Sequence, residues 1–485
     1  MNEPHRFDPT VLREYDIRGV VGHTLFAADA HAVGRAFGSA VVHAKGRRVA
    51  VGYDGRLSSP EFEAALVDGL ASTGLEVLRI GRGPTPMLYF VVHHLDLDGG
   101  VMVTGSHNPP EYNGFKMMLG KASFWGKNIQ ELGRRAAAGD FVVGAGKKRA
   151  HDIFEAYISR LAQDYRGERK LTVVWDPGNG AGGPATIALT KRLPGRHIVI
   201  NGEIDGRFPA HHPDPTVEAN LAQLKERVRA EQADLGVALD GDADRIGIID
   251  GTARILWGDQ ILAILAREVL AEKQEEKNIP NDPTSEPPVF ITSVSEGKPK
   301  TKIILDVKAS AASSQVILEA GGEPVLWKTG HSIIKTKMVE LDAPLAGEMS
   351  GHIFFRHRWY GFDDALYAAV RLLSVIARSD KSLAEMRDEL PHFVNTPELR
   401  FPCAEDRKFK VVDEVKERLK TAKAEVLAID GVRVTTGDGW WLLRASNTQD
   451  VLVARCEARD EEGLERLKAA LGVQLRLSGI ALPKT

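Results

Sequence analysis

Short apolar runs alternate with helix-like stretches through most of the first three quarters of the chain, and this alternation constrains the fold more than any other feature. Residues 48–54, RVAVGYD, precede a stretch at 59–74 with apolar residues at helical spacing, and 75–81, LEVLRIG, follows it. The pattern recurs at 171–180 and 301–310. Such alternation predicts α/β domains with mostly parallel, buried sheets. Ligands bind these sheets at the carboxyl ends of the strands.

The last part of the chain departs from this alternation. From about Pro391 it contains GVRVTTGDGWWLLRASNTQDVLVARCEA, which predicts two alternating strands around a tight turn and a smaller antiparallel α+β domain. The segment 273–300 also departs from it, with five prolines and mixed charge, and is interpreted as a surface excursion outside the core. A length of 485 residues fits three or four domains.

Composition excludes some classes of partner. The net charge is −3, from 63 basic and 66 acidic residues, so no global field favours nucleic acid or an anionic membrane. No run approaches the ~20 apolar residues of a membrane span, and the first residues lack a signal pattern. Cys403 and Cys456 form no metal-ligand spacing. We therefore expect a cytoplasmic protein without nucleic-acid or membrane partners.

Ser106 directly follows a buried-strand pattern. It lies in VMVTGSHNPPEYNGFKMM, residues 101–118, between a glycine and a histidine. Gly, Ser, Asn and Pro also make ordinary surface turns, so the local sequence leaves a turn and a nucleophile open. No G-x-S-x-G elbow surrounds the serine, which argues against a hydrolase.

Three carboxylates crowd the segment ALDGDADRIGIID. Asp240, Asp242 and Asp244 would repel one another and raise each other's pKa unless a cation neutralised them. An all-oxygen set selects a hard ion, and three ligands leave positions for water or a phosphate oxygen, which suits Mg²⁺. The alternative is an acidic turn with Arg245 as a surface partner.

Residues 178–183, GNGAGG, match the dinucleotide-binding pattern G-x-G-x-x-G after a strand, with Glu203 about twenty residues further on. However, Asp176 and Pro177 stand where the pyrophosphate turn should begin, and no hydride-transfer site accompanies the pattern. Glycines that allow close packing at a strand-to-helix turn are the preferred interpretation.

Two further polar segments follow apolar runs. RASNTQ, residues 444–449, supplies a guanidinium, two hydroxyls and an amide, which suit a phosphate but also a capped helix. GEMSGH, residues 347–352, offers a carboxylate, a hydroxyl and an imidazole, which suit a sugar but also a polar turn. Together with the serine and the acidic segment, they indicate phosphoryl transfer on a phosphosugar. Because no nucleotide motif is present, the phosphoryl group must come from the protein itself.

Five segments in order, REYDIRG, TGSHNPPEYNGFKM, DGDADR, GEMSGH and RASNTQ, resemble the motifs of the α-D-phosphohexomutase superfamily, most closely its bacterial bifunctional phosphomannomutase/phosphoglucomutase members. The resemblance implies four domains around a central cleft: three related α/β domains with mixed, mostly parallel sheets and a C-terminal α+β domain like the TATA-box-binding protein. The implied domains are 1–150 with the phosphoserine, 151–254 with the metal, 255–390 for the sugar, with an insertion at about 273–300, and 391–485 for phosphate.

The resemblance also implies a reaction. Hexose 1-phosphate and hexose 6-phosphate, of mannose and glucose, would be interconverted through a phosphoserine enzyme. Glucose 1,6-bisphosphate or mannose 1,6-bisphosphate would be the intermediate and activator, Mg²⁺ the cofactor, and the enzyme a monomer that binds a small phosphosugar. Glucosamine phosphate stays an alternative substrate, because phosphoglucosamine mutases share much of GEMSGH, although their serine motif usually reads SASHNP.

Site residues are implied where the motifs match. Those for phosphoryl and proton transfer are Ser106, His107, Lys116, Arg18 and Arg245, and those for the metal are Ser106, Asp240, Asp242 and Asp244. Those for the substrate are Tyr15, Lys308, Gly330, His331, Glu348, Ser350, His352, Arg444, Ser446, Asn447 and Thr448. The segment 273–300 is longer than the family's usual link before IILDVK and touches no motif.

Overall fold

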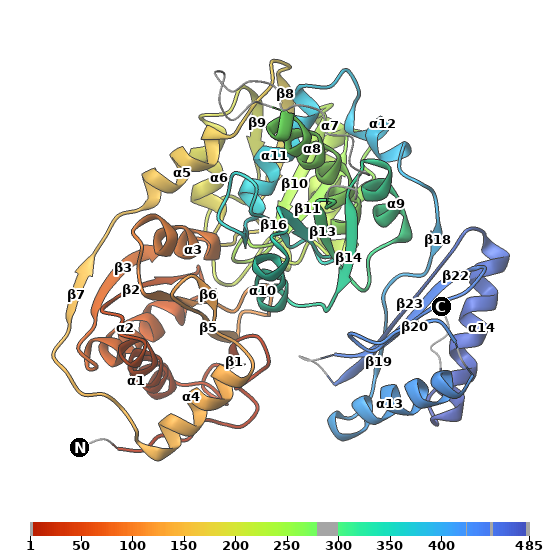
Figure 1. The fold of residues 1–485 in the computed structure, drawn as a ribbon. Coiled ribbons are helices and arrows are strands. Elements are labelled where there is room, and N and C mark those ends of the chain that lie inside the picture. The colour runs from red at the N-terminus through yellow and green to blue at the C-terminus, as the bar shows by residue number, and fades with distance from the viewer. Residues whose placement is uncertain (1–2, 279–298, 423, 447–449, 482–485) are drawn as a thin grey trace, which may run out of the picture.

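The computed structural model describes residues 3–278, 299–422, 424–446 and 450–481, and its strands form four separate sheets (Figure 1). Three α/β domains and one antiparallel domain follow one another along the chain around a central cleft, which confirms the predicted fold class. Within these ranges no helix has the length and apolar character needed to cross a membrane.

The first sheet is mixed. Its order is β1-β5-β4-β2-β3-β7, with β6 beside β5, and only β1, β5 and β6 join it through antiparallel pairs. The elements of this domain are β1 (Ile17–Val20), α1 (Ala27–His43), β2 (Arg48–Tyr53), α2 (Ser59–Ala71), β3 (Glu76–Arg82), α3 (Thr85–His94), β4 (Gly99–Val103), β5 (Tyr112–Leu119), β6 (Ala122–Ser123), α4 (Lys127–Ala138) and β7 (Lys147–Ala150).

The second sheet has the order β12-β11-β10-β8-β9, in which β8, β9 and β10 are parallel and β11 and β12 add antiparallel. The elements of this domain are α5 (Phe154–Gln163), β8 (Leu171–Asp176), α6 (Gly183–Thr190), β9 (Gly195–Val199), a 3-10 helix (Glu218–Leu221), α7 (Ala222–Ala230), β10 (Leu235–Leu239), β11 (Ile246–Asp250) and β12 (Ile255–Leu256).

The third sheet has the order β14-β13-β15-β16-β17, in which β13, β14 and β15 are parallel and β16 and β17 add antiparallel. The elements of this domain are α8 (Gly258–Asn278), β13 (Lys302–Asp306), α9 (Ala311–Glu319), β14 (Glu323–Trp327), α10 (His331–Leu341), β15 (Leu345–Gly347), β16 (Ile353–Phe355), β17 (Phe362–Asp363), α11 (Ala365–Ala377) and α12 (Leu383–Asp388).

The three α/β sheets share one topology, which positions the site. In each, a central strand (β2, β8 or β13) has the next strand on one side and the strand after that on its other side, all parallel, and a fourth strand adds antiparallel beside the third. The loops after the third strands β4, β10 and β15 are therefore equivalent. They carry Ser106, Asp242 and Glu348, which brings three functional loops to the carboxyl ends of three sheets.

The C-terminal domain contains one antiparallel sheet of order β18-β23-β22-β21-β20, with β19 beside β23. The predicted two strands in its GVRV…CEA segment were wrong, because the segment forms three: a first reversal lies at Thr436–Gly439 and a second follows Ala445. The elements are β18 (Val394–Asn395), β19 (Leu399–Pro402), α13 (Glu405–Thr421), β20 (Val426–Leu427), β21 (Val432–Thr435), β22 (Gly439–Ala445), β23 (Val451–Ala458) and α14 (Glu461–Leu477).

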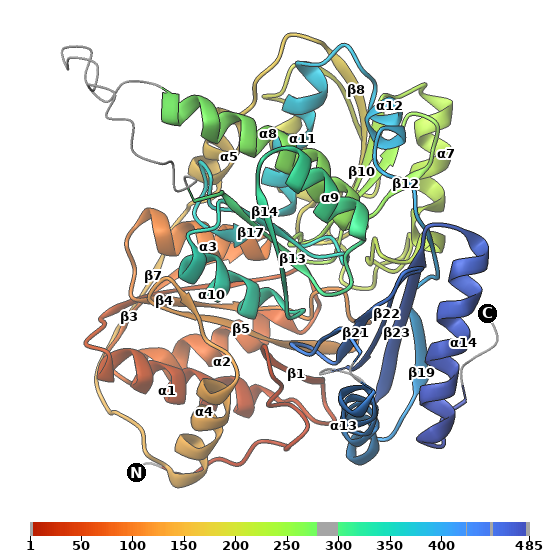
Figure 2. The same cartoon turned by 45° about the vertical axis from the view of Figure 1, so that its right-hand side comes forward.

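One apolar core joins the first three domains. It includes Phe90 of α3, Tyr157 of α5, Leu262 of α8 and Tyr367 of α11. The C-terminal domain, with α13 and α14, lies to one side of the other three (Figure 2) and has a core of its own. It meets the third domain through a small apolar cluster that includes Trp440 and Val307. The loops after β4, β10 and β15 therefore belong to domains that share a core. The C-terminal domain adds its residues to the cleft from a domain with a separate core.

The predicted surface excursion at 273–300 was wrong for residues 273–278. Residues 273–278 continue α8, and Glu276 Oε1 lies 2.9 Å from His357 Nε2. Residues 279–298 lie outside the described ranges. The domain boundaries given above stay a prediction.

Candidate active site

A cavity of about 210 Å³ lies where the four domains meet. Ser106, Arg245, Glu348 and Arg444 line it, one from each of the four domains. The predicted residues that line this cleft are Tyr15, Arg18, Ser106, His107, Lys116, Arg245, Lys308, Gly330, His331, Glu348, Ser350, His352, Arg444 and Ser446. The three predicted aspartates do not line the cleft themselves but contact lining residues such as Ser106 and Lys116. Asn447 and Thr448 fall outside the described residues.

Ser106 is buried rather than placed in a surface turn. Its φ of +48° lies in the left-handed region, which non-glycine residues adopt only when surrounding contacts hold them there. Its backbone N–H donates to Thr104 Oγ1 at 2.8 Å. Its hydroxyl lies 3.1 Å from Asp240 Oδ2 and 3.3 Å from His107 Nδ1. The hydroxyl therefore faces both the acidic loop and an imidazole.

Arg56 holds the Ser106 loop, and sequence reasoning missed it. Its guanidinium is fully buried and donates to the carbonyls of Ser106 at 2.7 Å, Asn108 at 2.6 Å, Pro109 at 2.5 Å and Tyr112 at 2.9 Å. It also pairs with Asp54, which accepts from the N–H of the residue before Ser106 at 3.1 Å. The available signal was a charged pair at the carboxyl end of a strand, in YDGR.

Asp240, Asp242 and Asp244 offer carboxylate oxygens that all lie within 4.8 Å of one another, and all three side chains are buried. Lys116 Nζ lies 2.8 Å from Asp242 Oδ2 and also pairs with Asp244. Burial, together with the other two carboxylates, raises the pKa of Asp240 well above its ordinary value. Lys116 therefore balances only part of the charge of the three carboxylates, and Arg245 and His352 also lie near them.

This acidic loop fits a divalent cation. The Oδ1 atom of Asp242 is buried and, among the described residues, has no hydrogen-bond partner. Asp244 Oδ1 is also buried without a hydrogen bond, although His352 Nε2 lies 3.3 Å from it. A buried carboxylate oxygen without a donor is costly, and a hard cation would satisfy it. The alternative of an exposed acidic turn is wrong, because these side chains are buried, as is that of Asp240 beside them.

The other side chains around Ser106 are cationic or neutral bases. Arg18 donates to the carbonyl of Gly105 at 2.7 Å and to Asn108 Oδ1 at 2.5 Å, so it supports the loop as well as facing the cleft. Burial, with help from Arg245 and Arg18, holds the pKa of His107 well below its ordinary value. The His107 imidazole is therefore neutral near pH 7 and able to accept a proton.

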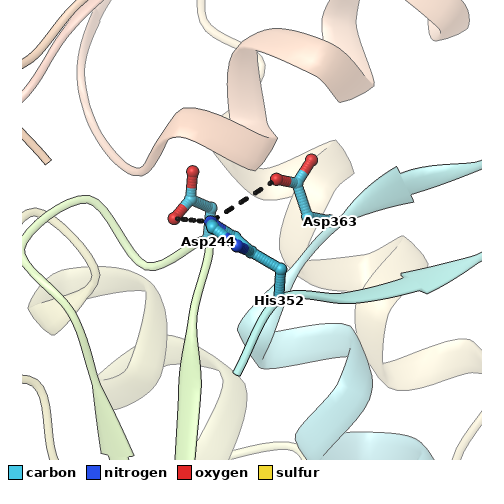
Figure 3. Close-up of side chains that lie close together, drawn as sticks. All are labelled: Asp244, His352 and Asp363. Carbon is cyan, nitrogen blue, oxygen red and sulfur yellow. Dashed lines mark ion pairs between the residues drawn. The ribbon is translucent and has the colours of Figure 1, made fainter. Parts of the chain in front are cut away.

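Glu348 and His352 connect the third domain to the acidic loop. His352 Nδ1 lies 2.7 Å from Glu348 Oε2, and its Nε2 lies 3.3 Å from Asp244 Oδ1 and 4.0 Å from Asp363 Oδ2 (Figure 3). Although burial and Arg245 oppose the charged form, Asp244 and Glu348 raise the pKa of His352 to about 9. Ser350 Oγ lies 3.3 Å from His352 Nδ1. The structure therefore places His352 between carboxylates.

Backbone atoms of residues 329 and 330 link three domains at the rim of the cleft. The N–H of Gly330 donates to Glu348 Oε1 at 2.7 Å, and the hydroxyl of Tyr15 donates to the carbonyl of Thr329 at 2.9 Å. The N–H of Thr329 donates to Asp430 Oδ2 at 3.1 Å, and the same oxygen accepts from Arg444 Nε at 3.1 Å. The sugar and phosphate loops of the prediction therefore lie together.

The glycine-rich segment 178–183 packs against the acidic loop. The N–H of Ala181 donates to the carbonyl of Gly241 at 2.9 Å, and a Cβ on Gly180 would approach that carbonyl to 2.7 Å. A Cβ on Gly241 would in turn approach the Ser106 carbonyl to 2.4 Å. Close packing, rather than a pyrophosphate, accounts for these glycines.

Four sequence models of the phosphoglucomutase/phosphomannomutase family match consecutive parts of the chain. They describe alpha/beta/alpha domain I at residues 9–142, domain II at 155–253, domain III at 257–393 and a C-terminal domain at 398–471.

Individual relatives match along almost the whole chain. A phosphomannomutase/phosphoglucomutase of Pseudomonas aeruginosa is 40% identical over 474 residues, which cover 98% of this chain and 97% of that protein. A phosphoglucomutase of Neisseria gonorrhoeae is 39% identical over 462 residues, with 94% and 95% covered. The crystal structure of a phosphoglucomutase/phosphomannomutase family protein from Burkholderia thailandensis superposes with a TM-score of 0.88 at 39% identity, covering 99% of this chain and 100% of that one.

Proposed function

Because the chain belongs to the phosphoglucomutase/phosphomannomutase family, we propose that it moves a phosphoryl group between O1 and O6 of a hexose through Ser106. Its activity is that of a phosphomannomutase/phosphoglucomutase, an isomerase of mannose and glucose phosphates. The observation that carries the role of Ser106 is its position, buried in the wall of the cleft with its hydroxyl 3.1 Å from Asp240 Oδ2.

The reaction has two half-steps. A hydroxyl oxygen of the hexose monophosphate attacks the phosphorus on Ser106, the bond to Ser106 Oγ breaks, and the proton that the sugar hydroxyl loses ends on Ser106 Oγ. The resulting 1,6-bisphosphate then presents its other phosphoryl group to Ser106 Oγ. That oxygen attacks, and the monophosphate leaves with a proton on its freed oxygen. The enzyme ends phosphorylated again, so no nucleotide is consumed.

The residues around Ser106 divide these tasks. His107, neutral and with Nδ1 at 3.3 Å from the hydroxyl, accepts the proton when Ser106 is the nucleophile. Lys116, which the neighbouring carboxylates keep charged, offsets negative charge on the moving phosphoryl group together with Arg18 and Arg245.

Asp240, Asp242 and Asp244 would hold Mg²⁺, which their all-oxygen donor set favours, with Ser106 or its phosphate as a further ligand. When bound, the ion would offset charge on the phosphoryl group during transfer. The buried Oδ1 atoms of Asp242 and Asp244 support this assignment.

The opposite side of the cleft binds the sugar and its second phosphoryl group. Glu348 and Ser350 would bind ring hydroxyls, and Arg444 and Ser446 the phosphoryl group, for which Asn447 and Thr448 are further candidates from the sequence. The remaining proposed substrate contacts are Tyr15, Lys308, Gly330, His331 and His352, of which His352 is also engaged with Asp244. Because one chain lines the whole cleft, a monomer is proposed to suffice.

Steady-state rates with glucose 1-phosphate, mannose 1-phosphate and glucosamine 1-phosphate test the proposed substrate class. Comparable kcat/KM for the first two, and a value at least about tenfold lower for the third, are expected from a site that binds shared hydroxyls. Turnover of glucosamine 1-phosphate alone would contradict the proposal.

A further inference from the structure

Glu398 is a carboxylate in the cleft that bridges two cations. It lies between β18 and β19, where the chain enters the C-terminal domain. Arg400 donates to Glu398 Oε1 at 2.7 Å through Nε and approaches it to 2.6 Å through Nη2, and Lys308 Nζ lies 3.1 Å from Oε2. All three side chains line the cleft, on the side that holds the proposed phosphate-binding Arg444.

Glu398 is a negative charge beside the cations that would bind a phosphoryl group, so it repels that group. Lys308, Arg400 and Arg444 are the cations here, and their carboxylate partners are Glu398, Asp430 and, 3.8 Å from Lys308, the buried Asp306. Although burial disfavours the charged form, Lys308 and Arg400 lower the pKa of Glu398 to about 2, so it is ionised at neutral pH. A phosphoryl dianion that approaches the same cations is repelled by this carboxylate, more strongly than it would be in water.

Lys308 has contacts besides Glu398 that hold it in place. Its side chain is buried, and Asp306 Oδ2 lies 3.8 Å from its Nζ. Its backbone carbonyl accepts a hydrogen bond from Arg455 Nη1 at 2.8 Å, which fixes the loop on the sheet of the C-terminal domain. Removing the Glu398 charge should therefore leave the Lys308 ammonium in the cleft and increase the positive potential there.

We propose that Glu398 is a positioning residue that limits how tightly Lys308 and Arg400 hold the phosphoryl group distant from Ser106. The inference rests on the proposed function, because only a bisphosphate that must turn around between half-steps needs a phosphate site that releases it. Stronger binding of the intermediate in one orientation would lower its free energy without lowering that of the transition state, and so would slow turnover.

The test compares Glu398→Gln, which removes the charge and keeps the size, with Glu462→Gln, an exposed carboxylate of the same domain. In a Ser106→Ala background, where no phosphoryl transfer occurs, calorimetry with glucose 1,6-bisphosphate should give a Kd at least about fivefold lower for Glu398→Gln. In the active enzyme, KM and kcat should both fall. Glu462→Gln should change neither quantity.

Arg400→Gln supplies the opposite change. It should weaken bisphosphate binding, and the double variant Glu398→Gln/Arg400→Gln should return Kd toward the starting value, because the two charges act on the same phosphoryl group. An unchanged or higher Kd for a folded Glu398→Gln protein would overturn the inference. It would show that Glu398 instead helps binding by holding Lys308 and Arg400 in position. Lack of hexose phosphate turnover by the wild-type chain would instead overturn the proposed function, whereas the binding measurement would still report on Glu398.

Discussion

The hydroxyl oxygen of Ser106 lies 3.1 Å from Oδ2 of Asp240, although 134 positions separate the two residues in the chain. Ser106 follows β4 and Asp240 follows β10, which are equivalent strands of the first and second sheets. The repeated topology places both loops at the carboxyl ends of these sheets, where they meet. A phosphate on the serine and a cation on the aspartates would therefore be neighbours, which is the arrangement that phosphoryl transfer needs.

Ser106 should carry phosphate in the active enzyme. Intact mass and peptide mapping of freshly purified protein are expected to show one phosphopeptide that contains this residue. Ser106→Ala should lower kcat by at least about a thousandfold, because the covalent intermediate cannot form. Full turnover by this variant would contradict the covalent route.

Asp242→Asn should weaken Mg²⁺ binding, since it removes one charge and one carboxylate oxygen from the acidic loop, at a residue whose buried Oδ1 has no hydrogen-bond partner. We expect kcat to fall by about a hundredfold or more, and the calorimetric Kd for Mg²⁺ to rise in parallel. Asp68→Asn, an exposed carboxylate of the first domain, is the control. Near-normal activity of Asp242→Asn in the presence of a chelator would exclude the metal assignment.

Arg56→Lys should loosen the Ser106 loop. A lysine ammonium has three donors at one point and cannot reach four carbonyls as the planar guanidinium does. Since buried acceptors would lose their donors, we expect a loss of about 2–4 kcal/mol in stability and at least a tenfold lower kcat. Hydrogen exchange should increase at residues 105–112. Arg79→Lys, whose partner Glu63 lies away from the loop, should leave that exchange unchanged.

The contrast between Ser106 and Arg56 shows what could be predicted from the sequence. Ser106 and Asp242 each lie in a contiguous sequence motif directly after an apolar strand. Residue type and spacing within the motif were therefore enough to identify them. Arg56 acts on carbonyls 50 to 56 positions away, and Glu398 joins cations from two domains. Such contacts depend on how loops meet in the folded chain, and no local pattern encodes them. The three-strand C-terminal segment was missed for a similar reason, because the polar residues after Ala445, where β22 ends, were interpreted as a phosphate-binding motif.

Asp364 should make stability depend on pH. It accepts from the hydroxyl of Tyr157 at 2.9 Å and from the N–H of Tyr367 at 3.0 Å, and burial raises its pKa to about 7. Because this pKa lies above that of the unfolded chain, about 3.9, the folded state binds the extra proton between these values. Its stabilising contribution is complete below about pH 4 and is lost as the pH rises through 7.

The melting temperature of the wild-type protein should therefore exceed that of Asp364→Asn by a larger margin at pH 5 than at pH 8, since asparagine has no proton to lose. Its amide oxygen can still accept from the N–H of Tyr367, and its amide NH2 can donate to the Tyr157 oxygen in place of accepting from it. Asp388→Asn, an exposed carboxylate, serves as the control. A margin that does not change with pH would show that Asp364 is ionised in the folded state.

Glu348→Ala should impair glucose and mannose phosphates by similar factors. The two sugars differ only at the 2-hydroxyl, so an enzyme that accepts both must bind them through hydroxyls that they share. Glu348 is buried in the wall of the cleft, held by the N–H of Gly330 and by His352, each at 2.7 Å, and so presents a fixed acceptor to the ring. Loss of a charged acceptor costs about 1.5–3 kcal/mol, which corresponds to a roughly ten- to hundredfold fall in kcat/KM for both substrates. Arg444→Ala, which removes a proposed phosphate contact on the same side of the cleft as Glu348, should mainly raise KM. A Glu348→Ala enzyme that lost one sugar and kept the other would refute binding through shared hydroxyls.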